Sequence, residues 1–93
     1  MVVASQTWTL SLPGCSSLKE KRSVVRSLKD KLRHSFNVSV AESGRQDVHA
    51  SAEITIALVA SDGRLAESML DKIDLFVDEN ADAVVASVRR EVY

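Results

Sequence analysis

Two hydrophobic periods follow each other along the chain, and their order restricts the fold more than any other feature of the sequence. From residue 2 to 12, apolar side chains occupy every second position, which is the period of a strand with one buried face. Residues 18 to 35 place apolar side chains every three to four positions, as a helix packed on one side does. Alternation returns at 36–41 and 52–59, a second helical segment follows from residue 63 to 79, and 84–92 alternates again. The sequence therefore predicts strand, helix, strand, strand, helix, strand.

Turn and capping residues separate these segments. Pro13-Gly14 ends the first strand, because proline has no amide donor for a strand neighbour and glycine tolerates turn geometry. Ser17 followed by Glu20 has the spacing of a capping box at a helix start. Residues 43–47 form a polar turn, and Asp62 can cap the second helix.

The periods also predict which side chains are buried. The first strand buries Val2, Ala4, Trp8, Leu10 and Leu12, with Gln6 as an exception on the same face. The third strand buries Ala52, Ile54, Ile56 and Leu58. The first helix buries Leu18, Val25, Leu28, Leu32 and Phe36, and the second helix buries Leu65, Met69, Ile73, Phe76 and Val77.

This element order predicts an α+β fold of the ferredoxin-like β-α-β-β-α-β type. Two right-handed crossovers and a central hairpin place both helices on one face of a four-stranded antiparallel sheet. The 93 residues suffice for one core of this size, so we expect a single domain over residues 1–93.

Composition narrows the setting. The one cysteine, Cys15, cannot form an internal disulfide, and the N-terminus has no basic residues before its apolar ones, as a secretory signal would. No apolar run reaches the length of a bilayer helix. We expect a cytoplasmic protein without membrane contact.

Charge is distributed very unevenly although the net charge is only −1. Residues 19–33 hold seven of the twelve basic residues against two acids, and residues 62–82 hold seven acids against two basic residues. Arg22, Arg26, Lys29 and Arg33 stand at i, i+4, i+7 and i+11, so they form one row on a helix, which we call the basic flank. Such a row can follow a phosphate backbone. The predicted RNA phosphate-binding residues are Lys19, Lys21, Arg22, Arg26, Lys29 and Arg33.

Other readings compete with RNA binding. The acidic helix can neutralise the basic one through exposed ion pairs, which contribute little each. The open sheet face, with small residues such as Ala41 and Ala57, suits homodimerisation or another protein contact, and its central strands lack the aromatics on which RNA-recognition motifs stack bases. An enzyme acting on a phosphorylated small molecule near Pro13-Gly14 is a third reading. No catalytic constellation is recognisable, and Cys15 alone is too little for a metal site, so we expect no enzyme and no cofactor.

The segments SLKEKR (17–22) and FNVSVAE (36–42), with Pro13-Gly14 and Gln46-Asp47, make the chain resemble the YlxP-like family of small bacterial domains of unknown function. The resemblance implies a ferredoxin-like fold and a translation-related setting, with ribosomal RNA (rRNA) or the small ribosomal subunit as the expected partner and no known catalytic residues. The family commonly carries an aromatic and basic residues after Gln-Asp, where this chain has residues Val48 to Ser51. A contact made by that loop would therefore differ here.

Overall fold

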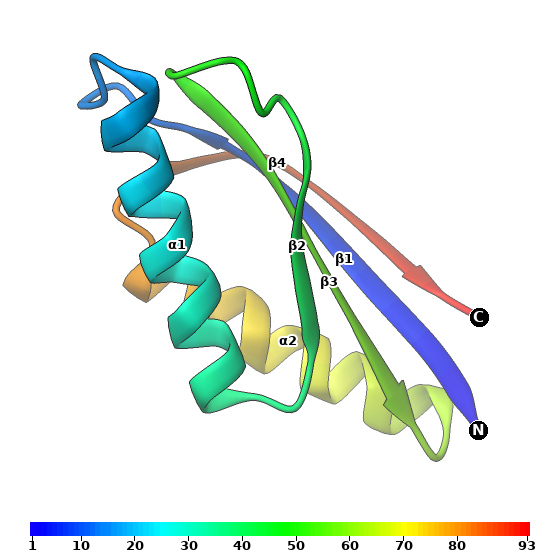
Figure 1. Cartoon of the computed structure of the whole chain (residues 1–93). Helices are drawn as coiled ribbons and strands as arrows, with labels where there is room; N and C mark the ends of the chain where they lie inside the picture. Colours follow the sequence, from blue (N-terminus) through cyan, green and yellow to red (C-terminus); the bar gives the residue numbers. More distant parts are fainter.

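The computed structural model describes residues 1–93 and shows the predicted order of elements (Figure 1). The elements are β1 (Val2–Ser11), α1 (Leu18–Ser35), β2 (Ser39–Gly44), β3 (Ser51–Ala60), α2 (Gly63–Asn80) and β4 (Val84–Val92). The strands form one antiparallel sheet in the order β2-β3-β1-β4, with both helices on one face. The predicted ferredoxin-like α+β fold is confirmed.

The core lies between the sheet and the two helices. The central pair β1–β3 is in register over its whole length, with Trp8 opposite Ile54 and Leu10 opposite Ala52. All four of these side chains are buried, as the alternation predicts. Gln6 is also fully buried on this face, so the one polar interruption in the pattern points inward rather than out.

Both helices begin at side-chain caps. The Ser17 hydroxyl accepts a bond from the Glu20 amide at 3.2 Å, and Asp62 accepts one from the Leu65 amide at 2.8 Å. The Glu20 carboxylate accepts from the Ser16 amide at 2.8 Å instead of from Ser17, so the reciprocal bond of the capping box is displaced by one residue. The predicted start of each helix is confirmed by these bonds.

The second strand lies further along the chain than the alternation predicts. Residues 36–41 were expected to form it, whereas β2 spans Ser39–Gly44. The Phe36 amide still donates to the Leu32 carbonyl at 2.9 Å, and the Phe36 ring packs edge-on against Phe76 with centroids 5.2 Å apart. Phe36 therefore caps the end of α1 and residues 37–38 connect it to β2, because the Phe36 ring is packed against the core.

The buried stripe of α2 also differs from the prediction. Leu65 is 44% exposed, and Met69 and Phe76 are only partly buried, while Ala66, Leu70, Ile73 and Val77 are fully buried. These four lie 45 residues after the buried positions 21, 25, 28 and 32 of α1. The first and last residues of α2, 63 and 80, also lie 45 residues after those of α1, 18 and 35. The two helices therefore use one spacing, and the small side chain of Ala66 conceals it in the sequence.

The two edges of the sheet differ in what lies beside them. β2 forms one edge and packs with α1, and β4 forms the other edge and packs with α2. The register between β1 and β4 shifts at Thr9/Leu10, so β4 carries a bulge near Ala86. Neither helix combines the length and apolar composition that crossing a bilayer requires.

Candidate functional site

The basic flank occupies one side of α1. At about 100° per residue, Arg22, Arg26, Lys29 and Arg33 fall within an arc of about 60°, roughly a quarter turn from the buried stripe. The three arginines are exposed and Lys29 is partly buried. The flank thus stands beside the core-facing stripe and points to solvent.

Contacts to neighbouring elements show which side of the molecule this flank occupies. Arg33 Nη2 donates to the Val40 carbonyl of β2 at 3.0 Å. The opposite side of α1, with Val24 and Lys31, borders a hollow that Asn80 and Asp82 at the end of α2 also line. The basic flank therefore lies along the β2 edge of the sheet and faces away from α2. Figure 1 shows α1 beside β2 at this edge.

The acidic helix does not neutralise the basic flank. No ion pair joins α1 to α2, and the only pair on the flank is Arg33 with Asp30 of the same helix, at 3.9 Å. Exposed pairs of this kind contribute about 0–1 kcal/mol, so Arg33 keeps its capacity to bind an anion. The side chains of Arg22 and Arg26 make no hydrogen bond or ion pair within the chain.

Lys21 lies inside the protein and not among the exposed cations, which corrects its predicted role. Its side chain is 1% exposed, and its Nζ lies 2.9 Å from Glu42 Oε2 and donates to the Arg45 carbonyl. Lys21 takes the position four residues before Val25 on the buried stripe, so its ammonium group faces β2. A phosphate outside the protein cannot reach it, whereas Lys19 is exposed and borders a shallow hollow with Arg22.

The Lys21 bond explains a backbone feature that the sequence did not indicate. Arg45 has φ of 60°, in the left-handed region that side-chain-bearing residues seldom adopt. Its carbonyl accepts from Lys21, and its Nη1 donates to Ser51 Oγ at 3.3 Å. The loop after β2, with Gln46 and Asp47, is therefore fastened to the first turns of α1.

The acidic side chains of α2 have a partner on β4 instead. Arg90 Nη1 bonds to Glu67 Oε2 and to Asp71 Oδ1, both at 2.8 Å. Partial burial acts to lower the pKa of Arg90, but the bonds to Asp71 and Glu67 outweigh it and raise that pKa above its ordinary value. Two carboxylates of α2 are thus paired at the β4 edge, on the far side from α1.

A buried polar group continues this network under α2. Gln6 Nε2 donates to Asp74 Oδ1 at 3.0 Å, and Gln6 Oε1 accepts from Arg90 Nε at 2.8 Å. The indole of Trp8 donates to the same Asp74 oxygen at 2.9 Å. Gln6, which interrupts the apolar alternation of β1, therefore has a partner for both its amide nitrogen and its amide oxygen, and it joins β1, β4 and α2.

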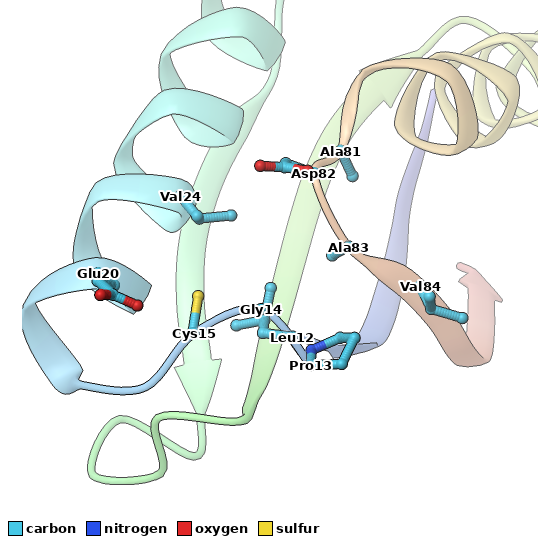
Figure 2. A pocket seen from close by; sticks show the side chains of 10 residues that line it. All are labelled: Leu12, Pro13, Gly14, Cys15, Glu20, Val24, Ala81, Asp82, Ala83 and Val84. Carbon is cyan, nitrogen blue, oxygen red and sulfur yellow. The ribbon is translucent and has the colours of Figure 1, made fainter.

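A cavity of about 460 Å³ opens beside Pro13-Gly14, and Figure 2 shows Cys15 directing its sulfur into it. Its ionisable lining consists of Cys15, Glu20 and Asp82. No lysine or arginine lines the cavity, and Glu20 is already bonded to Ser16. A phosphorylated substrate would meet only carboxylates there, so the geometry gives no support to the enzyme reading at this loop.

The open face of the sheet is small and polar in its centre. Hydroxyl groups bond across three strands, from Thr7 to Thr55 at 2.8 Å and from Thr55 to Ser43 at 2.7 Å. The paired residues Val3 and Val59 are 40% and 63% exposed at one end of this face. Since the hydroxyls already satisfy one another, the centre of the face offers few free groups to a ligand.

Fold and surface together define a ferredoxin-like α+β domain with one cationic helix flank at a sheet edge. Residues 3–90 match the family described as "Protein of unknown function (DUF503)", and the chain belongs to this family. It is also 37% identical over 62 residues to the "Uncharacterized protein YlxP" of Bacillus subtilis (strain 168), a match that covers 67% of each chain. The resemblance to YlxP-like proteins is confirmed.

Proposed function

We propose that this protein is a non-catalytic RNA-binding accessory domain that holds a phosphate backbone along α1, with rRNA or the small ribosomal subunit as its partner. The observation that carries the proposal is the basic flank, which is exposed at the β2 edge and free of ion pairs with α2. The translation-related setting implied by the family resemblance favours RNA among polyanions.

The dimensions of the flank suit a backbone rather than a small ligand. Arg33 lies eleven positions after Arg22, so at 1.5 Å per residue the four cations extend over about 16 Å. Lys19 prolongs the row at the N-terminal end, and the hollow between Lys19, Arg22 and Arg26 is shallow and without apolar lining residues. These are features of a surface that neutralises successive phosphates.

The cations differ in how freely they can bind. The side chains of Arg22 and Arg26 have no partner within the chain, whereas Arg33 donates one N–H to the Val40 carbonyl. A guanidinium group has five donors, so Arg33 can still bind a phosphate. Contacts of this type position an RNA without reading its bases, so we expect binding with little sequence preference.

The test is binding of a labelled single-stranded RNA by fluorescence anisotropy across a salt series. Four phosphate contacts predict a slope of about −3 for log affinity against log salt. Arg26→Glu should weaken binding and bring the slope to about −2, because one contact is lost. Lys31→Glu is the matched control, since it makes the same charge change on the side of α1 that faces the end of α2.

Lys31→Glu should leave the slope close to that of the unchanged protein. Equal losses in Arg26→Glu and Lys31→Glu would mean that only net charge matters, and affinity that does not depend on salt would exclude phosphate contacts. Either result would overturn the proposal.

A further inference from the structure

α2 carries an acidic row that repeats the geometry of the basic flank. Glu67, Asp71, Asp74 and Asp78 stand at i, i+4, i+7 and i+11, and each lies 45 residues after a member of the basic flank. We call these four residues the acidic flank. Because the buried stripes are related by the same interval, each row has the same angular position on its own helix.

The two flanks lie at opposite edges of the sheet. The acidic flank borders β4, since Arg90 bonds to Glu67 and Asp71, and it reaches β1 through the bond from Trp8 to Asp74. The basic flank borders β2, which is the other edge. Within one chain the two rows therefore face away from each other and cannot meet.

Their charges are opposite and similar in size. On the acidic flank four carboxylates stand against the single guanidinium of Arg90, which leaves three net negative charges. On the basic flank four cations stand against Asp30, which leaves three net positive charges. A second copy of this chain thus presents, on its own α2, a surface complementary to α1 of the first.

We propose that copies of this protein associate head to tail, with the basic flank of one copy against the acidic flank of the next. The spacing of each row is four, three and four residues, which reads the same in both directions. Arg22 and Arg33 of one copy can therefore lie opposite Asp78 and Glu67 of the next along antiparallel helices over about 16 Å. Asp74 adds its charge from the inner side of the row, because its Oδ1 accepts from Gln6 and Trp8. A two-fold symmetric contact through either flank would instead place like charges together, which is unfavourable.

The arrangement also agrees with the strand directions. Every neighbouring pair in the order β2-β3-β1-β4 is antiparallel, so the two edge strands β2 and β4 run in opposite directions. A copy displaced sideways in the same orientation brings these two edges to the same side as the charged flanks. Because Arg33 already binds the Val40 carbonyl of β2, the charged flanks and not strand pairing would hold the contact. The proposal uses the basic flank but does not depend on its binding RNA.

The test measures mass by sedimentation equilibrium over a range of protein concentrations. At low salt the average mass should rise with concentration above the 10.2 kDa of one chain. It should return to the mass of one chain at about 0.5 M salt, where charges on a surface are screened over a few ångströms.

Two double variants then separate the flanks. Arg22→Glu with Arg26→Glu reverses the basic flank only. Asp71→Asn with Asp78→Lys removes the net charge of the acidic flank only, while Glu67 keeps its bond to Arg90. Each variant alone should stay at the mass of one chain. An equimolar mixture should form dimers that grow no further, because one variant keeps an intact acidic flank and the other an intact basic flank.

The control is Glu79→Lys, which changes charge on α2 next to Asp78 but about 100° around the helix, and which should still associate. Wild-type protein that keeps the mass of one chain at all concentrations would overturn the proposal. A mixture of folded variants without dimers would also overturn it, as would association that neither double variant weakens, the result expected for dimerisation through the sheet face. The acidic-flank variant should keep full RNA affinity, so loss of RNA binding and loss of association are measured separately.

Discussion

Substitution of Lys21 by methionine tests whether this residue belongs to the structure or to the binding surface. Methionine has a similar length and retains the apolar contacts of the lysine stem, so the change removes the charge without opening a large cavity. The ammonium group is 1% exposed and has two partners, Glu42 and the Arg45 carbonyl. The variant should therefore lose stability and retain the exposed cations.

The size of the loss follows from what remains buried. Glu42 Oε2 lies in the interior without a well-directed hydrogen bond, so the charge of Lys21 at 2.9 Å is its compensation. Leaving a buried charge without its partner costs about 3 kcal/mol, the lower end of the range, because the Glu42 side chain is 18% exposed. The Arg45 carbonyl also loses its donor, which adds about 1 kcal/mol. The free energy of unfolding should fall by about 4 kcal/mol in total.

A second substitution isolates the charge term. In Lys21→Met combined with Glu42→Gln no buried charge remains, so the free energy of unfolding should recover most of the 3 kcal/mol. A loss of about 1 kcal/mol should persist, because the Arg45 carbonyl still lacks its donor. Urea unfolding measures both values, and fluorescence of the single, fully buried Trp8 reports the transition. With a slope of about 1.5 kcal/mol per molar urea, the single variant should lower the midpoint by about 2.7 M.

The reasoning is refuted if Lys21→Met lowers the free energy of unfolding by less than about 1 kcal/mol. Such a small loss would mean that Glu42 does not need the charge of Lys21 as compensation. It is also refuted if the double variant is as unstable as the single one. RNA binding supplies the functional readout. Where Lys21→Met remains folded, the salt slope of binding should match that of the unchanged protein, because Lys21 contacts no phosphate.

Three further predictions concern other parts of the molecule. Asp62→Ala should lower the free energy of unfolding by about 1 kcal/mol in urea, because the Leu65 amide loses its cap. Gln6→Leu should lower it by about 2 kcal/mol, since Asp74 and Arg90 each lose a buried partner, and an unchanged midpoint would contradict that account. Excess single-stranded RNA should return the self-associated protein to single chains in sedimentation, because RNA and the acidic flank of a second copy require the same cations. Assemblies that persist with RNA bound would show that the two partners bind separate surfaces.

The sequence was most informative where one face of an element is continuously apolar. The bounds of α1 and the inward face of β3 follow from periodicity, because each side chain there has one environment only. In α2 the predicted burial of Ile73 and Val77 is confirmed. Prediction was wrong at Leu65, where the large side chain outweighed the small one of Ala66, although packing against the sheet favours the smaller residue. Volume alone is a poor guide to burial when two helices must approach one sheet.

The candidate site could be predicted only in part. The basic flank follows from the i, i+4, i+7, i+11 spacing. Lys21 lies outside that spacing and was wrongly included among the predicted phosphate-binding residues, because lysine is normally exposed. In the structure, Lys21 lies on the buried stripe with Val25, Leu28 and Leu32. Its spacing from these three residues was the signal that could have identified it as buried. The bond between Gln6 and Arg90 joins residues 84 positions apart and has no local signature. Only the assembled sheet brings these two together.

Arg33 also shields the rim of the sheet. β2 is an outermost strand, and the guanidinium occupies the Val40 carbonyl that would otherwise be open to any unpaired strand. Natural proteins protect such rims with charged side chains because bare ones recruit other chains and precipitate. Loss of Arg33 would therefore show itself as turbidity on storage as well as weaker anion binding, and for this reason Arg22 and Arg26 are the cleaner positions at which to probe the flank.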